Sequence, residues 1–97
     1  MDNKKIKEML KILRALDNDT RLKILAVLQA EPNLSFNDIA RKTGIERGAL
    51  AYHLGVLKQA GLVELKYERR SKKITQYRLT DKARDVLAKL GLDKVLE

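Results

Sequence analysis

The order of two short helical segments in the middle of the chain constrains the fold more than any other feature of the sequence. The first, residues 35–43, begins at the capping residue Ser35 and ends at Gly44. The second, residues 46–60, follows almost directly and ends at Gly61. Two short helices joined by a tight turn predict a helix-turn-helix.

Two strand-like runs follow the second helix. Residues 62–68 and 74–79 alternate apolar and polar side chains, as strands of a half-exposed hairpin do. They flank a basic loop, residues 69–73. Helix, tight turn, helix and charged hairpin, in that order, predict a winged helix-turn-helix. This is a mainly α-helical fold with a small β-hairpin, and it is built to place one helix in a DNA groove.

Three further helices complete the predicted fold. The spacing of apolar residues predicts helices over 4–16 and 20–29 before the helix-turn-helix, and over 81–90 after the hairpin. The middle one, residues 20–29, is apolar on more than one side and should lie at the centre of the core. A chain of 97 residues is the size of a small domain, so we expect a single domain over residues 1–97.

The composition disfavours several functions. The chain has no cysteine and a single histidine, which argues against disulfides, cysteine nucleophiles and histidine-based metal sites. It also lacks a nucleophile paired with a base and a glycine-rich phosphate loop. We therefore expect no enzyme, no cofactor and no bound metal. No apolar segment is long enough to cross a membrane and no signal-peptide pattern is present, so a cytoplasmic protein without membrane contact is expected.

The net charge of +8 favours a polyanionic partner. Between Lys66 and Lys73 five basic residues stand against one acid, so half of the net charge lies in eight residues. We expect a wing over residues 68–74 to contact the DNA backbone or the minor groove. Its basic residues are Arg69, Arg70, Lys72 and Lys73. The alternative is a solvated, charged hairpin tip.

The helix over residues 46–60 has two distinct faces. Its apolar stripe, expected to face the core, consists of Leu50, Leu54 and Leu57. The opposite stripe has the same spacing and consists of Gly48, Tyr52, Gly55 and Gln59. Each exposed glycine costs a helix about 1 kcal/mol relative to alanine, and we interpret the pair as permitting close approach to a groove. Tyr52 and Gln59 can hydrogen-bond base edges or phosphates.

Further DNA contacts are expected around this stripe. Arg47 and Lys58 flank it and are suited to phosphates. Ser35 and Asn37 open the preceding helix, whose N-terminal amides can hold a phosphate, although Ser35 is needed as a cap in any case. His53, at the edge of the leucine stripe, is expected to be half-buried with a structural or phosphate-contacting role. The alternative to the close-approach interpretation of the two glycines is that Gly48 lies in a frayed first turn and that Gly55 is merely tolerated.

The terminal helices, residues 4–16 and 81–96, carry more apolar surface than a monomer of this size needs. We therefore expect them to form the interface of a homodimer. The candidate interface residues are Ile6, Met9, Leu10, Leu13, Val86, Leu87, Leu90, Val95 and Leu96.

Three segments of the chain resemble a known family. Residues 16–25 (LDNDTRLKIL) are similar to the opening of ArsR-like transcriptional regulators, and residues 50–63 (LAYHLGVLKQAGLV) resemble their recognition helix and its exit. Residues 77–80 (YRLT) resemble the junction before the last helix, which the related MarR-like regulators share. The resemblance implies a homodimeric winged-helix repressor whose terminal helices form the dimer interface.

The sequence departs from this family at two points. Many metal-sensing members use cysteines, or pairs of His and Asp in the last helix, whereas Asp81 and Asp85 here have no histidine beside them. Metal sensing is therefore disfavoured. Ala51 stands where the family often has a DNA-contacting serine, so this position of the recognition helix is expected to face DNA without that hydroxyl.

The leading hypothesis is a sequence-specific regulator of transcription that binds double-stranded DNA as a homodimer, with helix 46–60 in the major groove. Two alternatives remain open. One is a winged-helix module that contacts other proteins within a larger assembly. The other is a low-specificity, chromatin-like protein that coats DNA.

Overall fold

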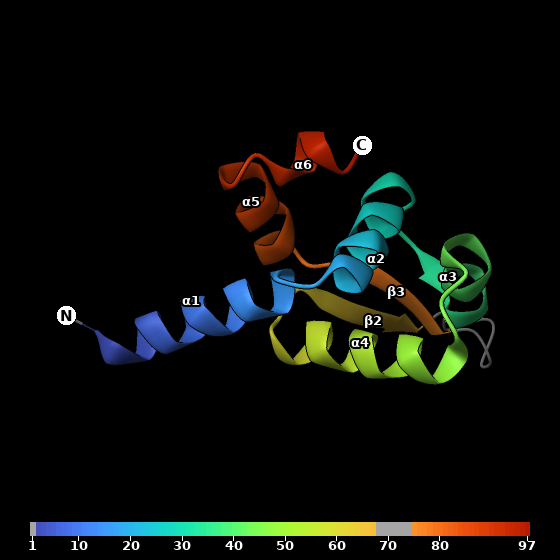
Figure 1. Ribbon diagram of the computed structural model, residues 1–97, viewed down its shortest axis with the longest axis horizontal. Coiled ribbons are helices and arrows are strands. Elements are labelled where there is room, and N and C mark those ends of the chain that lie inside the picture. Colours follow the sequence, from blue (N-terminus) through green and yellow to red (C-terminus); the bar gives the residue numbers. More distant parts are fainter. Residues whose placement is uncertain (1, 68–74) are drawn as a thin grey trace.

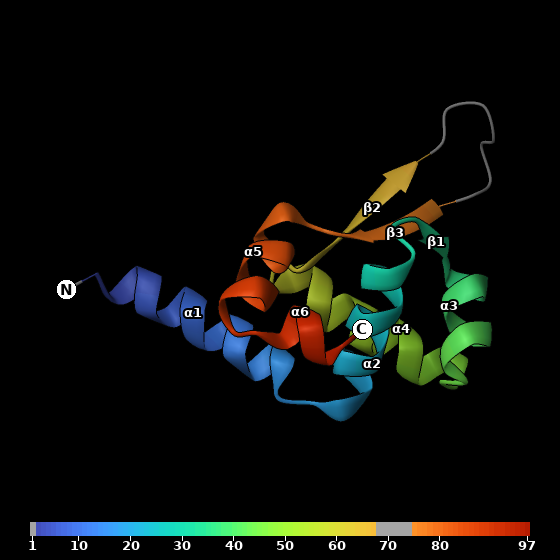
Figure 2. The same cartoon turned by 90° about the horizontal axis from the view of Figure 1, so that it is seen from above.

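The computed structural model describes residues 2–67 and 75–97, except for the side chain of Tyr67. The elements follow in the order α1 (Asn3–Leu16), α2 (Asp19–Ala30), β1 (Leu34–Ser35), α3 (Phe36–Thr43), α4 (Arg47–Gln59), β2 (Val63–Tyr67), β3 (Thr75–Leu79), α5 (Asp81–Lys89) and α6 (Leu92–Val95). Helix α1 extends from one end of the molecule and the β2–β3 hairpin from the other, with α4 lying along one side (Figure 1; Figure 2).

The helix starts follow from the capping residues in the sequence. Asn18 Oδ1 accepts a hydrogen bond from the Arg21 amide at 3.0 Å and so caps α2. Ser35 and Asp38 form a reciprocal capping box at the start of α3, as their spacing predicts. Thr80 caps α5 through the Ala83 amide at 3.0 Å, and its hydroxyl donates to the Gly61 carbonyl at 2.6 Å. Thr80 therefore also fixes α5 to the end of α4.

The sheet has three antiparallel strands in the order β1–β3–β2. In the predicted hairpin Val63 pairs with Leu79 and Leu65 with Tyr77, which confirms the hairpin. Strand β2 begins at Val63, one residue later than predicted, and the predicted strand residues Glu68 and Ile74 lie outside the described residues. The third strand, β1, has only two residues and pairs Leu34 with Tyr77. Two residues show no measurable alternation, so the sequence did not predict this strand.

One cluster of buried side chains joins the helices to the sheet. Helix α2 lies at its centre, as its all-round apolar character predicts, and contributes three side chains without exposed surface. The largest fully buried side chains are Ile24, Leu25, Leu28, Ile39, Leu50, Leu57, Leu62 and Leu87. Helix α4 is thus held by its leucine face against α2, which leaves the opposite face free.

Candidate nucleic-acid interface

The corner between α3 and α4 is fixed by hydrogen bonds within the turn. Gly44 ends α3 with φ of 71°, a left-handed conformation that glycine adopts without strain. The Thr43 hydroxyl is buried; it donates to the Ile39 carbonyl at 2.7 Å and accepts from the Ile45 amide at 3.3 Å. The angle between the two helices is therefore set by the protein before any ligand binds.

Helix α4 is capped by an acid at its N-terminus. The two carboxylate oxygens of Glu46 accept hydrogen bonds from the amides of Gly48 and Ala49, at 2.8 and 3.0 Å. These two bonds lower the pKa of Glu46 below its usual value, so the carboxylate is ionised at neutral pH. The first amides of α4 are already occupied, and a phosphate would have to displace Glu46 to reach them.

The two faces of α4 separate as predicted. Leu50, Leu54 and Leu57 are buried, whereas the outward face is open to solvent. Tyr52 is 65% exposed and stands at the middle of that face. Its other exposed members are Arg47, Gly48, Ala51, Gly55, Lys58 and Gln59. The structure therefore brings the seven predicted recognition-helix residues onto one accessible surface.

The two glycines of this face have different surroundings. A Cβ atom on Gly48 would lie 3.2 and 3.3 Å from the carboxylate oxygens of Glu46, so Gly48 makes room for the helix cap. A Cβ atom on Gly55 would meet nothing within 4 Å. Nothing within the described part of the protein requires Gly55. Only this second glycine therefore needs an explanation from outside the protomer.

Arg47 is held in place by α3. Its guanidinium donates to Asn37 Oδ1 at 2.8 Å and lies over the Phe36 ring, 5.0 Å from the centroid. Beside it is a polar hollow of about 660 Å³ between the start of α3 and strand β3, lined also by Thr75 and Gln76. The fold therefore positions a cation beside this hollow.

The start of α3 is less open to a phosphate than the sequence suggested. The Ser35 hydroxyl accepts from the Asp38 amide at 3.1 Å, and the Asp38 carboxylate accepts in return from the Ser35 amide at 3.4 Å. Hydrogen bonding to Ser35 and then to Arg41 lowers the pKa of Asp38, which is therefore anionic at neutral pH. An anion at this helix start opposes phosphate binding there.

His53 is half-buried and takes part in a contact between helices. Its Nδ1 lies 3.2 Å from Nη1 of Arg21 in α2. Arginine has no acceptor atom, so Nδ1 is the acceptor and the ring is neutral. Burial, followed by the charge of Arg21, lowers the pKa of His53. A neutral ring gives little attraction for phosphate, which leaves the structural role as the better supported of the two expectations.

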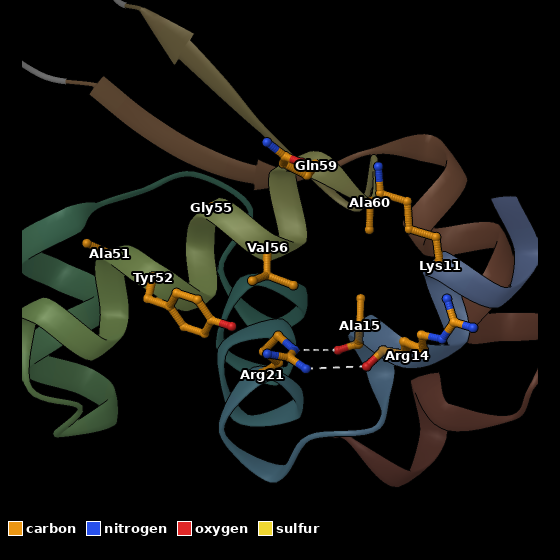
Figure 3. A pocket seen from close by; sticks show the side chains of 10 residues that line it. All are labelled: Lys11, Arg14, Ala15, Arg21, Ala51, Tyr52, Gly55, Val56, Gln59 and Ala60. Carbon is orange, nitrogen blue, oxygen red and sulfur yellow. Dashed lines mark hydrogen bonds between the residues drawn. The ribbon is translucent and has the colours of Figure 1, made fainter. Parts of the chain in front are cut away.

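Arg21 is the main functional neighbour that the sequence did not single out. Its Nε donates to the Ala15 carbonyl at 2.8 Å and its Nη2 to the Arg14 carbonyl at 3.3 Å (Figure 3). The guanidinium thus caps the end of α1 and contacts α4 through His53. Arg21 lies within residues 16–25, the segment that resembles the opening of ArsR-like regulators, and this resemblance is the only feature of the sequence that could have drawn attention to it.

An open groove of about 540 Å³ separates α1 from the outer side of α4. Ala15, Val56 and Ala60 form its apolar floor, while Lys11 and Arg14 of α1 stand across from Tyr52 and Gln59 (Figure 3). Gly55 also lines it. The predicted recognition face therefore continues from α4 onto α1, a continuation that the sequence does not reveal.

The predicted wing contacts lie outside the described residues. Arg69, Arg70, Lys72 and Lys73 all belong to residues 68–74, which are not described.

Within residues 2–67 and 75–97 no cluster of three His, Cys, Asp or Glu side chains is placed to hold a metal ion. In the same residues, none of the helices has the length and apolar character to cross a bilayer.

Most of the predicted dimer residues are exposed. Apart from Tyr52, the large apolar side chains that are exposed, and not merely partly buried, in the described residues all belong to α1 or to the C-terminal segment. These side chains are Ile6, Met9, Leu10, Leu13, Leu90 and Val95, with Met9 63% and Val95 75% exposed. Val86 and Leu96 are partly buried against the core. Leu87 is only 1% exposed, so it belongs to the protomer core and is removed from the expected interface.

The architecture and the exposed helix face define a winged helix-turn-helix protein, and comparisons with known proteins agree. The family described as winged helix-turn-helix DNA-binding matches residues 17–64. A biofilm growth-associated repressor of Xylella fastidiosa is 33% identical over 78 residues, covering 80% of this chain and 65% of the relative. The chain spans between 42% and 65% of the length of the curated relatives that it matches.

Solved structures give the same result. The transcriptional repressor BigR from Xylella fastidiosa is 31% identical, with a TM-score of 0.74 over 90% of this chain and 83% of that one. A homodimeric winged helix-turn-helix domain from Mycobacterium bovis, a possible ArsR-family regulator, is 25% identical. Its TM-score is 0.79 over 95% of this chain and 85% of the other. The chain belongs to the winged helix-turn-helix DNA-binding family, and the resemblance to ArsR-like transcriptional regulators noted in the sequence is confirmed.

Proposed function

We propose that this chain is a sequence-specific regulator of transcription that binds double-stranded DNA as a homodimer and acts as a repressor. The observation that supports this most is the outer face of α4. Its leucine side is buried, while the opposite side, centred on Tyr52, is exposed on a rigid helix. A helix presented in this way fits the major groove, where base edges distinguish all four base pairs.

The contacts divide into two kinds. Tyr52 and Gln59 have hydrogen-bonding groups for base edges, and Gly55 and Ala51 permit close approach of the helix. Arg47, steadied by Asn37, is placed for a backbone phosphate. Lys58 and the wing at residues 68–74 would add phosphate contacts. All of these are binding interactions, so the proposed activity is non-catalytic.

Dimerisation is supported by the exposed apolar side chains of α1 and the C-terminal segment. Burial of such side chains is favourable by about 25 cal/mol per Å² of apolar surface. The Mycobacterium bovis neighbour is described as homodimeric, and the Xylella fastidiosa matches named above are described as repressors. A dimer would bind two half-sites about 34–36 Å apart, one helical turn of DNA.

Selection of bound sequences from a random duplex library tests this proposal. We expect a pseudo-palindromic consensus whose half-site centres are separated by about one helical turn. Binding without any consensus would instead indicate a protein that coats DNA with low specificity. Absence of duplex binding even at low salt would favour a protein-interaction module and would refute the proposal.

A further inference from the structure

Helix α1 is divided into three faces. At about 100° per residue, Ile12, Ala15 and Leu16 fall in one sector, and these three side chains are buried. A second sector contains the exposed apolar residues expected at the dimer interface, Ile6, Met9, Leu10 and Leu13. The third sector, about 80° wide, contains Lys4, Lys7, Lys11 and Arg14. We refer to these four residues as the basic stripe.

The basic stripe is not explained by the fold. Helix α1 has five basic residues and one acid, so it carries as much net charge as residues 66–73 do. None of the ion pairs formed within the described part of the chain involves a residue of α1. All four stripe residues are exposed. None of the four side chains therefore forms an ion pair within the described protomer, and Glu8 is the one acid of α1.

The stripe is continuous with the recognition face. Lys11 and Arg14 form one wall of the groove whose other wall is Tyr52, Gly55 and Gln59 of α4 (Figure 3). From Lys4 to Arg14 the stripe extends about 15 Å along the helix, which matches about four phosphates of one DNA strand. Arg21 fixes the position of the α1 end relative to α4, so this spacing is set by the fold.

We propose that the basic stripe of α1 is a second contact surface for the DNA backbone. This proposal rests on the proposed function and extends it. Two observations favour a phosphate backbone as the occupant: the charge is unpaired and of one sign, and the stripe adjoins the helix that enters the groove. In a dimer formed through the apolar face of the same helix, the two stripes lie near the two-fold axis. They meet the backbone between the half-sites.

The test compares two variants with the same loss of charge. In the stripe variant Lys4, Lys7, Lys11 and Arg14 are each replaced by Gln, which keeps helix propensity. In the control variant Lys5, Lys23, Lys82 and Lys94, all exposed and away from the stripe, are replaced by Gln. The affinity of each full chain for a duplex with the selected site is measured by fluorescence anisotropy between about 50 and 200 mM salt.

Each lost phosphate contact flattens the slope of log K against log[salt] by about 0.9. For each bound protomer, we expect the stripe variant to flatten it by about 2 to 4, the double variant Lys11→Gln/Arg14→Gln by about half as much, and the control by less than about 1. Equal slopes for the stripe and control variants would show that only overall charge matters and would overturn the proposal. A stripe variant with the wild-type slope would do the same.

Failure of the basic-stripe proposal can be distinguished from failure of the proposed DNA-binding function. If the wild-type protein binds no duplex at low salt, the proposed function itself fails. If it binds, and Tyr52→Ala removes the sequence preference while the stripe variant keeps its slope, only the basic stripe is refuted. Hydroxyl-radical footprinting adds a positional readout. Protection at the centre of the site should disappear in the stripe variant and persist in the control.

Discussion

Replacement of Gly55 by alanine should strengthen the fold and weaken DNA binding at once. Gly55 lies in the interior of α4, where glycine costs a helix about 0.8–1.0 kcal/mol relative to alanine. A Cβ atom there meets nothing within 4 Å, so no contact within the described protomer opposes the gain. The expected stabilisation is about 1 kcal/mol, or a rise in Tm of about 4–8 °C for a domain of this size.

The same methyl group would stand on the face proposed to approach DNA. Overpacking in a close interface typically costs about 1–3 kcal/mol, which corresponds to a loss of affinity of about fivefold to 150-fold. Urea and thermal unfolding at one fixed protomer concentration measure the first effect, because dimerisation makes stability depend on concentration. Fluorescence anisotropy with the selected duplex measures the second.

Gly48→Ala is the matched control. Its new Cβ atom would lie 3.2–3.3 Å from the Glu46 carboxylate, which would have to shift away from the amides that it caps. We therefore expect a smaller gain in stability than at Gly55, or a loss. If Gly55→Ala is less stable than the wild type, the open surroundings assigned to Gly55 are wrong. If it is more stable but binds DNA with unchanged affinity, Gly55 does not approach the duplex.

Three further predictions concern the turn, the histidine and the dimer. Thr43→Val leaves the Ile45 amide without its acceptor and should lower the free energy of unfolding by about 1–2 kcal/mol in urea titrations. Thr43→Ser keeps the hydroxyl and should retain most of the wild-type stability. A valine variant as stable as the wild type would contradict the role of the Thr43 hydroxyl in fixing the turn. The pKa of His53 is lowered in the folded state, so the unfolded chain binds its proton more tightly and stability should fall as pH drops from about 7 through the folded-state pKa. His53→Gln should reduce this acid-induced loss of stability, as read from urea midpoints at about pH 7.5 and 5.5. An unchanged pH dependence in the variant would contradict the lowered pKa of His53 as its cause. The double variant Met9→Gln/Leu13→Gln should sediment as a folded monomer at tens of micromolar, while the control Lys5→Gln should remain a dimer. A double variant that sediments like the wild type would exclude the apolar face of α1 from the interface.

Much of the fold is encoded in local signals. Ser35 with Asp38, Gly44 and Thr80 mark the ends of helices through bonds that depend on near neighbours in the sequence, so α3, α4 and α5 were predictable almost to the residue. The pairing of Val63 with Leu79 follows from apolar alternation in two adjacent runs. These features need no knowledge of the tertiary structure.

The features that the sequence did not predict depend on long-range contacts. Strand β1 has two residues and exists because β3 offers a free edge to Leu34. Arg21 of α2 joins the end of α1 to α4, and its partner in α4, His53, lies 32 positions further along the chain. Leu87 lies one position after Val86 and three before Leu90 in the same apolar pattern, and only its burial in the assembled fold shows that it belongs to the core.

For the candidate site, the sequence predicted which residues share a face but not what surrounds them. The spacing of Tyr52, Gly55 and Gln59 was sufficient to place them together on the outside of α4. It did not show that Gly48 accommodates the Glu46 cap, nor that Lys11 and Arg14 face the same groove from another helix. Both facts require the relative positions of groups that helical periodicity alone does not fix.

The central claim is that the exposed face of α4 recognises the DNA sequence. The most direct test is the ratio of affinities for the selected duplex and for a duplex of scrambled sequence, measured at one salt concentration. We predict a ratio of about 10³ or more for the wild type, reduced tenfold or more in Tyr52→Ala/Gln59→Ala while non-specific binding persists. A wild-type ratio near one, or a ratio unchanged in the double variant, would contradict the account.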